Sequence, residues 1–561
     1  MNSPLDNLMQ SHSVRYWKTH HGTSSPLLQV REAISQKHGN LNAEEIKELS
    51  RQLGMPESTV ISIISYYSDL HSPSQAWRIC RGTSCNLAGA EKLQSMLERQ
   101  ARCREVYCLG HCYQGPAALN ETDQVLVGGE LFNFGNAAEP KHRPPATPSI
   151  RCLAKRAIVT KRAAREVYTL EQAQAEGVYS SFFHCLNDPP IKIIEALEQA
   201  GERGRGGAGF STGKKWRSCA EFRAEKRYVI ANGDEGDPGS FIDRVLLEND
   251  PHGVIEGILL CAYAVGATQA IVFIRSEYPK AIQRMQRAIR ATYKAGILGP
   301  DAAYPLEISI FPGMGSYVCG EETAMLNAIE GLRGEVRIRP PYPAQAGLYG
   351  KPTVVNNVET LVNVAAIIAG GAQAYAALGT QTSAGTKAMC LDHGFAQPGI
   401  VEVEFGITIR ELIDSAGGAA NGEPLEAVIL GGPMGSLLLP DQWDVEICYG
   451  AMAKSGIQLG HGGLVALQTG TNYRILLEQW LKFMIDESCG KCTPCRLGPN
   501  QALITLQDDK IIEDTKKEKI TKLLGVVEQS SLCAFGQHMP SPIRNLIEVF
   551  GDRIFDQGDG K

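Results

Sequence analysis

The stretch "DESCGKCTPCRLGP", residues 486–499, places Cys489, Cys492 and Cys495 at every third position. A further cysteine, Cys533, follows in "SSLCAFG". A [4Fe–4S] cluster needs four converging thiolates, and two-residue gaps let one loop supply three of them. Zinc is a competing interpretation, although zinc knuckles usually present two separated C-x2-C pairs, and free thiols are a third. The stretch therefore predicts a C-terminal cluster domain, with its fourth ligand supplied from beyond an intervening helix.

A second group of cysteines lies near the N-terminus, in two pairs. The pairs are Cys80 with Cys85, and Cys108 with Cys112. Two pairs on strand-end loops suit a [2Fe–2S] rhomb, which takes two ligands per iron. Four cysteines in two pairs also suit zinc, so spacing alone leaves both alternatives open. We do not expect the nearby Cys103 to be a ligand, and we expect His111 to face solvent.

The whole chain has 561 residues, a formal net charge of −6 and 16 cysteines. It is too long for one hydrophobic core, so several domains are expected. The N-terminus "MNSPLDNLMQSHSVRYWK" has no apolar region typical of a signal peptide, which predicts a cytoplasmic protein. Cysteines in such a protein are metal or cluster ligands more often than disulfides. The absence of a long basic run disfavours nucleic-acid binding, and polar residues within 354–379 disfavour a membrane span.

Shifts in composition divide the chain into six parts. Within 26–70, two stretches with helical periodicity each end in glycine. Short strand-like runs follow these stretches. A segment rich in Pro and Ala then separates the strand-like runs from a larger α/β region. The predicted parts are a helical segment (1–75), a small α/β unit (76–135), a linker (136–150), a large α/β region (151–385), a β-rich domain with one helix (386–470) and a helical domain (471–561).

The densest glycine stretch is "GERGRGGAGFSTGKKW", residues 201–216. Its glycines allow tight curvature and close approach of a ligand to the backbone. Free N–H groups there can hold a phosphate, and Lys215 adds a positive charge. The pattern matches neither the P-loop nor the dinucleotide fingerprint, so a merely flexible loop is the alternative. The glycines concerned are Gly204, Gly206, Gly207 and Gly209.

Three further motifs carry acidic and amide side chains. "YVIANGDEGDPGSFIDR" (228–244) ends a predicted strand, "GMGSYVCGEETAMLNAIEG" (313–331) opens a helix, and "KPTVVNNVET" lies at 351–360. Carboxylates and amides hydrogen-bond the hydroxyl and N–H groups of a flavin or nicotinamide. A solvated acidic turn or a magnesium site is the alternative. Together with the glycine loop, the set suits a flavin with a stacked dinucleotide; its members are Asn232, Asp234, Glu235, Glu321, Glu322, Asn356 and Asn357.

Six motifs, in order, resemble the flavin-binding, NADH-reading subunit of respiratory complex I and its relatives in NAD-linked hydrogenases and formate dehydrogenases. They are "GRGGAGFSTGKKW", "NGDEGDPGSF", "YVCGEETA", "RPPYPAQAGLYGKPTVVNNVET", "ESCGKCTPCR" and "SLCAFG". The match covers roughly residues 150–550. Residues 26–130 resemble the thioredoxin-like [2Fe–2S] partner of that subunit, here fused to the same chain. The resemblance implies an α/β multidomain fold: N-terminal helices with a thioredoxin-like domain, a Rossmann-like FMN domain, a ubiquitin-like β-grasp domain, and a helical [4Fe–4S] domain.

The resemblance also implies residue roles. Arg205, Gly206, Gly207, Gly209 and Lys215 would embrace the FMN phosphate and the dinucleotide. Phe210 and Tyr342 would stack on adenine, and Glu321 and Glu322 would face the nicotinamide. Where complex I members carry Lys and Phe, this chain has Arg339 and Tyr342, which keep a cation and an aromatic ring. The residues that would line the FMN are Asn232, Asp234, Glu235, Tyr317, Gly320, Val355, Asn356, Asn357 and Thr360.

These features predict an NAD(H)-linked diaphorase, because a flavin can pass electrons between a two-electron donor and one-electron clusters. Residues 431–467 look most like the diaphorase subunit of NAD-dependent molybdenum formate dehydrogenases. We therefore expect a hetero-oligomer with a larger molybdenum and iron–sulfur subunit that oxidises formate. The same module of an NAD-reducing hydrogenase or of complex I is the alternative. A non-catalytic electron-relay scaffold is a third hypothesis.

Overall fold

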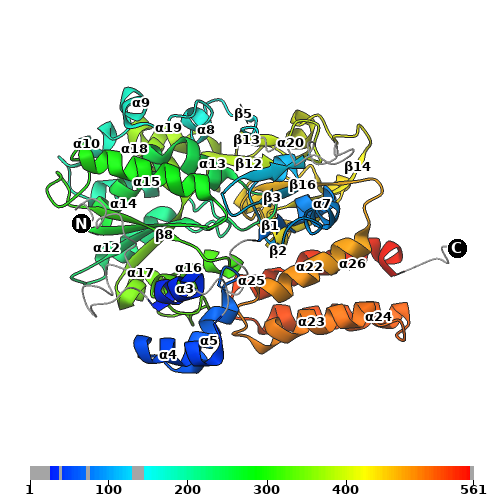
Figure 1. Ribbon diagram of the computed structural model, residues 1–561. Helices are drawn as coiled ribbons and strands as arrows, with labels where there is room; N and C mark the ends of the chain where they lie inside the picture. The colour runs from blue at the N-terminus through cyan, green and yellow to red at the C-terminus, as the bar shows by residue number, and fades with distance from the viewer. Residues whose placement is uncertain (1–25, 37–40, 71–75, 129–144, 556–561) are drawn as a thin grey trace.

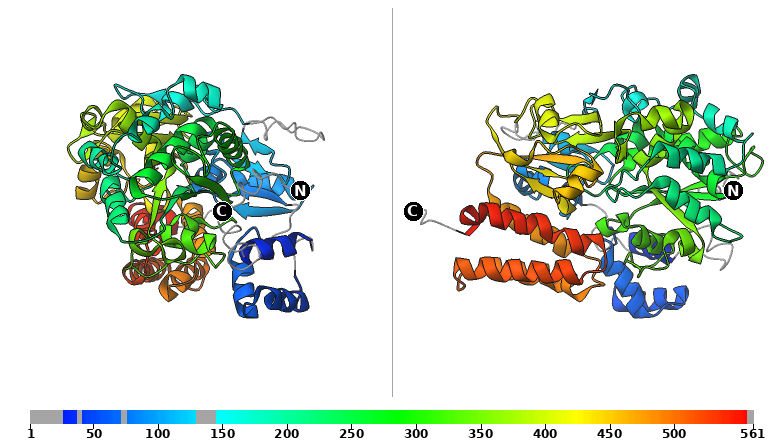
Figure 2. Two further views of the ribbon diagram at one scale, coloured as in Figure 1. Left: turned by 90° about the vertical axis from the view of Figure 1, so that its left-hand side faces the viewer. Right: turned by 180° about the vertical axis from the view of Figure 1, so that it is seen from behind.

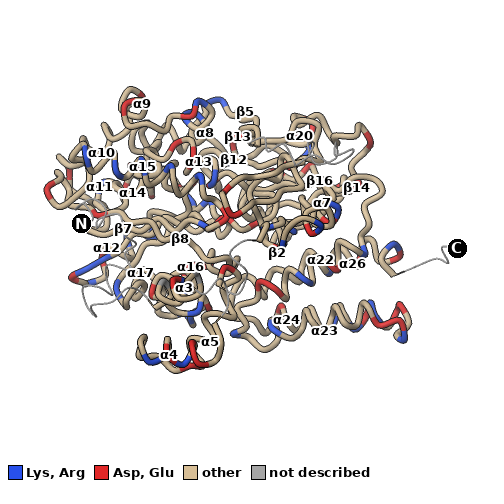
Figure 3. Tube along the Cα trace, viewed as in Figure 1, with Lys and Arg blue, Asp and Glu red and all other residues tan. Residues whose placement is uncertain are grey.

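The computed structural model describes residues 26–36, 41–70, 76–128 and 145–555. Most of the predicted linker (136–144) and the first 25 residues lie outside these ranges. The predicted mixed α/β multidomain class is confirmed: an α/β body carries a layer of C-terminal helices on one side and the N-terminal helices beside them (Figure 1). Figure 3 shows basic and acidic residues interspersed along most elements of the described chain.

The flavin region is built on a four-stranded parallel sheet in the order β8-β7-β6-β9. The runs "KRYVIANG", "QAIVFIRS" and "LEISIFPG" predict three of its strands, which are β6 (Tyr228–Gly233), β7 (Gln269–Ile274) and β8 (Glu307–Pro312). The fourth, β9 (Thr353–Asn357), begins the stretch 354–379, which the sequence predicts to be a buried loop followed by a helix. The chain adds β7 and β8 on one side of β6 and later adds β9 on the other side, so the strand order reverses between β6 and β9. In open α/β sheets, ligands bind at the carboxyl ends of strands at such a switch point.

Both faces of this sheet are covered, as a parallel sheet requires. Alternate residues of β6 pack into different cores: Val229 and Ala231 into one, Tyr228 and Ile230 into the other. The first core contains helices α14 (Pro251–Val265) and α18 (Val358–Gly370). The second contains the N-terminal helices α3 (Pro26–Gln36), α4 (Ala43–Leu53) and α5 (Glu57–Tyr66). The N-terminal helices therefore form one layer of the flavin region.

The small α/β unit contains a four-stranded sheet in the order β2-β1-β3-β4. Strands β1 (Trp77–Cys80) and β2 (Cys103–Val106) are parallel, joined by helices α6 (Thr83–Leu87) and α7 (Ala90–Leu97). A crossover of this kind is what parallel neighbours require. Strand β4 (Val125–Val127) is as predicted, whereas β3 (Ala117–Leu119) was not predicted. The sheet places Cys80 at the end of β1 and Cys108 just beyond β2.

The β-rich domain forms a six-stranded sheet in the order β15-β14-β16-β12-β13-β5. The hairpin β12 (Thr386–Leu391) and β13 (Gly399–Glu404) precedes α20 (Ile409–Ser415), and β16 (Gly463–Gln468) pairs in parallel with β12. Strands β14 (Leu425–Leu430) and β15 (Ser436–Leu438) complete the β-grasp arrangement, and a second helix, α21 (Tyr449–Lys454), joins the predicted one.

The domain boundary predicted at residue 150 is wrong. Strand β5 (Ile150–Cys152) pairs in parallel with β13, so it extends the sheet of the β-grasp domain. A three-residue strand carries no alternation that a sequence could reveal, and its partner lies about 250 residues further along the chain.

The C-terminal domain consists of helices packed side by side (Figure 2). They are α22 (Tyr473–Glu487), α23 (Thr493–Gln507), α24 (Glu513–Ser530), α25 (Ala534–His538) and α26 (Pro540–Phe555). Cys495 lies in the first turn of α23, so the chain reaches Cys533 through the rest of α23 and the whole of α24, where one intervening helix was expected. No helix of the described ranges is both long and apolar enough to cross a bilayer.

Candidate flavin and iron–sulfur sites

The carboxyl ends of β6 and β9 bring three of the predicted motifs together. Asn232 of β6 lies opposite Asn357 of β9 in the parallel register. The Asn232 side-chain amide donates a hydrogen bond to the carbonyl of Gly320, at 2.9 Å. The acidic turn, the amide pair and the turn before Glu321 thus meet at the topological switch point. This is the position at which a doubly wound sheet binds a nucleotide or flavin.

The glycine loop lies directly against this edge. A Cβ added at Gly206 would stand 3.1 Å from Cβ of Asn357, and one added at Gly209 would stand 2.6 Å from the Tyr449 ring. Gly207 has a φ of +112°, a conformation that L side chains rarely adopt. The glycines therefore let the loop backbone pack closely against the switch point, where a side chain would not fit.

The side chain of Arg205 is buried inside the fold. Its guanidinium is fully buried, 2.6 Å from Glu202 Oε2, and it also donates to the Tyr375 hydroxyl at 2.7 Å. A buried arginine that gives up its carboxylate partner is strongly disfavoured, so the side chain is held inside the fold. Only the Arg205 backbone reaches the site, where its N–H donates to Thr360 Oγ1 at 2.9 Å. Arg205 therefore braces the loop from within, and its Nη1 atom has no hydrogen-bond partner among the described residues.

Asp234 is the acidic residue that stays available at the end of β6. Its Oδ2 atom is buried, and no hydrogen-bond donor reaches it among the described residues. Burial raises the pKa of the Asp234 carboxyl well above its usual range, although Arg275 lies 3.8 Å away. An unpaired buried acceptor is costly unless a ligand supplies the donor. A hydroxylated ligand such as the ribityl chain of FMN fits this atom, so the residues present fit the flavin.

Glu235, which follows Asp234 in the chain, has both carboxylate oxygens occupied. They accept hydrogen bonds from the backbone N–H groups of Asp243 and Arg244, at 3.1 and 3.0 Å. These groups open helix α13 (Ile242–Asn249), whose N-terminus favours a negative charge. Burial nevertheless raises the pKa of the Glu235 carboxyl to about 7. Asp234 therefore keeps a buried acceptor for a ligand at the switch point, whereas both oxygens of Glu235 are bound by the N-terminus of helix α13.

A charged group lies beside the switch point, at the start of helix α16 (Glu322–Ile329). Glu321 caps this helix, as the sequence predicts, by accepting from the N–H groups of Thr323 and Ala324 at 2.9 and 3.0 Å. The Glu322 carboxylate lies between Lys215 Nζ at 3.3 Å and the Arg339 guanidinium at 3.4 Å. Lys215 also donates to the carbonyl of Val355, at 3.1 Å.

Two aromatic side chains near this group are exposed. Phe210 is 57% exposed and Tyr342 is 54% exposed. Large aromatic rings usually bury their faces, and a ring left open next to a binding crevice offers a stacking surface for a base. The two positions are those for which adenine stacking was implied, and this role stays a prediction.

The N-terminal cysteines form the two expected pairs, and all four are buried. The Sγ atoms of Cys108 and Cys112 lie 3.4 Å apart, and Cys112 Sγ accepts from the N–H of Gly239 at 3.3 Å. A [2Fe–2S] cluster takes two thiolates per iron, and the close Cys108–Cys112 pair suits one iron of such a cluster.

His111 does not face solvent as predicted. It is only 6% exposed, and its ring lies at the junction of the cysteine loop with the flavin region. Tyr113 Oη lies 3.4 Å from its Nδ1 atom, and burial lowers the pKa of His111 well below its usual range. The prediction failed because the loop is covered by another domain, which the local sequence does not show.

The C-terminal cysteines converge from two loops. Cys489, Cys495 and Cys533 are buried, while Cys492 is half-buried. The N–H of Leu532, next to Cys533, donates to Cys492 Sγ at 3.3 Å, which joins the distant loop to the three-cysteine run. Three thiolates from one tight loop and one from a remote residue suit the corners of a [4Fe–4S] cluster.

A cluster of aromatic rings connects the three sites. Tyr107, next to Cys108, packs edge-on against Phe483 at 5.0 Å between ring centroids. Tyr317 of the flavin region packs against Phe483 at 5.1 Å and against Phe535 at 5.8 Å. Sequence reasoning named Tyr317 but missed Tyr107, Phe483 and Phe535. Tyr107 and Phe535 could have been found by their position, because Tyr107 precedes Cys108 and Phe535 lies two residues after Cys533.

A flavin-type switch point, a two-pair cysteine site and a four-cysteine site packed around one aromatic core define a flavin and iron–sulfur electron-transfer module. Comparison with known proteins agrees. Three family profiles match: the Nuo51 FMN-binding domain at 197–366, the NADH-ubiquinone oxidoreductase-F iron–sulfur binding region at 476–557, and the thioredoxin-like [2Fe–2S] ferredoxin at 14–126.

Curated relatives are similar across most of their length. The NADP-reducing hydrogenase subunit HndC of Solidesulfovibrio fructosivorans is 39% identical, over 68% of this chain and 79% of the relative. An NADH-quinone oxidoreductase subunit of Rhizobium meliloti is 37% identical, over 68% of this chain and 93% of the relative. A solved structure of an NAD+-reducing [NiFe]-hydrogenase in the H2-reduced state matches with a TM-score of 0.80 and 29% identity, covering 94% of this chain and 92% of that chain.

The chain belongs to the complex I 51 kDa flavoprotein family, and it carries the thioredoxin-like [2Fe–2S] domain in the same polypeptide. It is an NAD(H)-linked flavin and iron–sulfur oxidoreductase subunit. FMN, a [2Fe–2S] cluster and a [4Fe–4S] cluster are its cofactors.

Proposed function

We propose that this chain is the diaphorase subunit of a cytoplasmic NAD-linked formate dehydrogenase and exchanges electrons with a larger molybdenum and iron–sulfur subunit. The observation that carries the diaphorase role is the packing of both cysteine sites around the aromatic residues that adjoin the flavin crevice. The formate assignment is supported by residues 431–467, which resemble the diaphorase subunit of molybdenum formate dehydrogenases.

In this proposal, the switch-point residues hold FMN. The backbone of the glycine loop and Lys215 hold the phosphate, and Asp234 accepts from a ribityl hydroxyl. The remaining FMN contacts come from Asn232, Glu235, Tyr317, Gly320, Val355, Asn356, Asn357 and Thr360. When bound, FMN accepts two electrons together from NADH and passes them singly to the clusters. The eight cysteines hold the clusters: Cys80, Cys85, Cys108, Cys112, Cys489, Cys492, Cys495 and Cys533.

The dinucleotide lies over the exposed rim of the crevice. Phe210 and Tyr342 stack on the adenine, Arg339 supplies a cation, and Glu321 and Glu322 face the nicotinamide end. Truncation of a stacking ring costs about 1–3 kcal/mol, so Tyr342→Ala should raise the KM for NADH by about 5- to 100-fold with an unchanged FMN content. Phe183→Ala, which removes another exposed ring, is the control. An unchanged KM in Tyr342→Ala contradicts the stacking role.

The reconstituted chain tests the diaphorase role directly. Anaerobic reconstitution should give one FMN and about six irons per chain, the sum of a two-iron and a four-iron cluster. The product should reduce an artificial dye with NADH, and the same assay with NADPH decides nucleotide choice. A chain that takes up neither FMN nor iron contradicts this function and favours the relay-scaffold hypothesis.

A second candidate is the same module of an NAD-reducing hydrogenase. The observation in its favour is the [NiFe]-hydrogenase structure, which covers 94% of this chain. The two candidates differ only in the partner. Anaerobic purification of the native complex should yield molybdenum and formate-dependent reduction of NAD+. Nickel together with hydrogen-dependent activity would establish the second candidate instead.

A further inference from the structure

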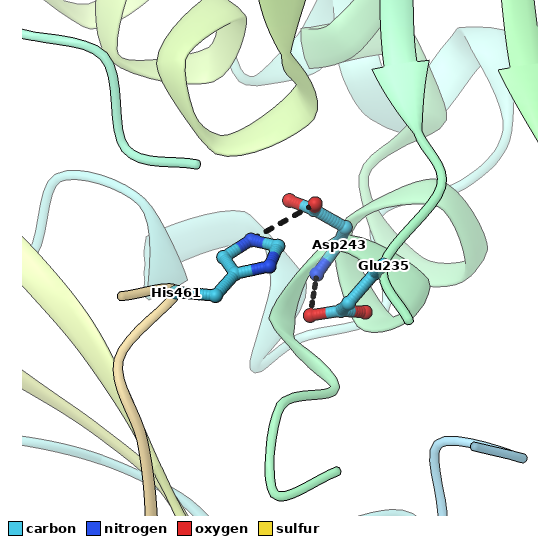
Figure 4. A group of neighbouring side chains, drawn as sticks. All are labelled: Glu235, Asp243 and His461. Carbon is cyan, nitrogen blue, oxygen red and sulfur yellow. Dashed lines mark hydrogen bonds and ion pairs between the residues drawn. The ribbon is translucent and has the colours of Figure 1, made fainter. Parts of the chain in front are cut away.

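A buried charged group lies where the β-grasp domain meets the flavin region (Figure 4). His461 comes from the loop before β16, and its Nε2 atom lies 3.1 Å from Oδ2 of Asp243, in the first turn of α13. Glu235 completes the group from the turn after β6. All three side chains are buried, although they come from three separate elements.

The carboxylates of this group are already saturated with N–H donors. Asp243 Oδ2 accepts from His461 and from the Asn357 side-chain amide, while Asp243 Oδ1 accepts from the Glu359 N–H at 3.2 Å. Both Glu235 oxygens accept from the first turn of α13. A divalent cation would have to displace these donors, whereas an imidazolium supplies one. The geometry therefore fits a charge-assisted His461–Asp243 pair better than a metal site.

Neighbouring charges decide the protonation state of His461. Asp243 and Glu235 favour the imidazolium, as does Asp237 in the acidic turn, while Lys387 of β12 opposes it. Lys387 is itself paired with Glu359 of α18, at 2.5 Å, and both are fully buried. Burial is the largest single influence and lowers the pKa of His461, but the charge and hydrogen bond of Asp243 together with the charge of Glu235 outweigh it and raise the pKa to about 9. The ring is thus charged at neutral pH.

The pair touches the flavin loop at two points. Asn357, which donates to Asp243, packs against Gly206, and a Cβ added there would lie 3.1 Å from Cβ of Asn357. Gly460, next to His461, packs against Gly207, where an added Cβ would lie 3.4 Å from the Gly460 carbonyl carbon. The His461 loop and Asn357 therefore pack directly against the glycine loop and support it.

We propose that His461 is a positioning residue that clamps the β-grasp domain to the glycine loop through Asp243 and Asn357, so that FMN retention depends on this ion pair. The inference rests on the proposed placement of FMN at the glycine loop. It assigns to the β-grasp domain a part in flavin binding. His461 acts through Asp243 and Asn357 and does not itself need to touch the flavin.

The test compares the anaerobically purified full chain with His461→Ala and His461→Gln. Charge-assisted hydrogen bonds predict that His461→Ala weakens FMN binding by about 10- to 100-fold at pH 7, and that His461→Gln, which keeps a donor without the charge, falls between. His184→Ala is the matched control, because His184 is exposed on α10 (Ser180–Cys185). FMN per chain, FMN dissociation constant and iron content are measured from pH 6 to 10.

The pH profile separates clamping from general damage. The folded-state pKa of His461 is raised, so the pair's contribution is complete below about 6.5, the pKa of free histidine, and is lost as pH rises through about 9. Wild-type FMN affinity should fall as pH rises through about 9, whereas His461→Ala should lack this fall and keep only the titration of Glu235, whose pKa is raised to about 7. The thermal midpoint of the FMN-free protein should differ between the two chains at pH 7 and converge above pH 9.

Three results would overturn the inference. These are FMN binding by His461→Ala within twofold of wild type, loss of iron and FMN together in both variants, and a stoichiometric divalent metal that disappears in His461→Ala and Asp243→Asn. A wild-type chain that takes up no FMN at any pH contradicts the proposed function instead. In that case the FMN-free thermal midpoints still report on the ion pair.

Discussion

The two cysteine sites are built in different ways. The N-terminal site is held by other domains: the Arg275 guanidinium donates to the carbonyl of Cys108 at 2.8 Å, and the N–H of His393 donates to the carbonyl of Cys112 at 2.9 Å. The C-terminal site is held by its own helical domain through Ser488 and Leu532, and by one contact from the flavin region, where the Arg333 guanidinium donates to the carbonyl of Cys489 at 2.8 Å.

This contrast is also one of exposure. Every ligand of the N-terminal site is buried, whereas Cys492 of the C-terminal site is half-buried and lies near the exposed side chains of Leu497 and Leu532. His393 of the β-grasp domain contacts the N-terminal site, because its backbone N–H donates to the carbonyl of Cys112. The [2Fe–2S] site is therefore internal to the fused chain, whereas the [4Fe–4S] site reaches the surface through its Cys492 ligand.

Removal of one ligand from each site is the largest expected effect and tests whether the sites are independent. Cys495→Ser should lose the four-iron cluster and leave about two irons per chain, and Cys85→Ser should lose the two-iron cluster and leave about four. Iron analysis and electron paramagnetic resonance of the reduced chains measure this. The matched control is Cys152→Ser, at an exposed cysteine outside both sites. If either variant loses all iron, the two sites depend on one another.

Of the two cysteine sites, Arg275→Ala should damage only the N-terminal one. The Arg275 guanidinium is buried and donates to the carbonyls of Cys108 and Glu235, each at 2.8 Å. Its loss removes the donor to the Cys108 carbonyl, whereas the Glu235 carbonyl keeps the Tyr278 hydroxyl at 3.0 Å. Breaking a buried charged contact of this kind costs about 3–5 kcal/mol in the free energy of unfolding. Denaturant unfolding and iron content are the measurements, and we expect the four-iron signal to survive. Arg410→Ala, at an exposed ion pair with Asp444, should leave both unchanged.

Tyr107→Phe is the smallest expected effect and tests the contact between the two cluster domains. The Tyr107 hydroxyl donates to Asp486 Oδ2 at 2.9 Å, while its ring packs on Phe483. The variant keeps the ring and loses the hydrogen bond, so the free energy of unfolding should fall by about 1 kcal/mol with both clusters retained. Tyr168→Phe, at a tyrosine outside this contact, is a control. Loss of either cluster in Tyr107→Phe would show that the hydrogen bond does more than join domains.

The sequence predicted the features that depend on residue type and spacing within a short stretch of the chain. The cysteine spacings, the glycine loop and the acidic and amide motifs each occupy a short stretch, and their chemistry depends on residue type and interval. The strands β6, β7 and β8 were equally visible, because a buried parallel strand is a continuous apolar run. The three predicted motifs beside β6 and β9 meet in space because strand order brings the carboxyl ends of these strands together.

Contacts between distant parts of the chain could not be predicted in the same way. The solvent exposure expected for His111 failed because another domain covers its loop, and β5 joined a sheet about 250 residues away. The side chain of Arg205 turned inward because Glu202 and Tyr375 offered it buried partners. His461 carried a weak signal, a histidine between glycines, and nothing local connected it with Asp243.

The amino-acid sequence by itself determined which cofactors this protein can hold, because ligand type and spacing are properties of short segments. The tertiary structure decided which cluster site is internal, which arginine is structural and which histidine supports the flavin loop. Those outcomes depend on burial and charge pairing between domains, and such contacts exist only once the chain has folded.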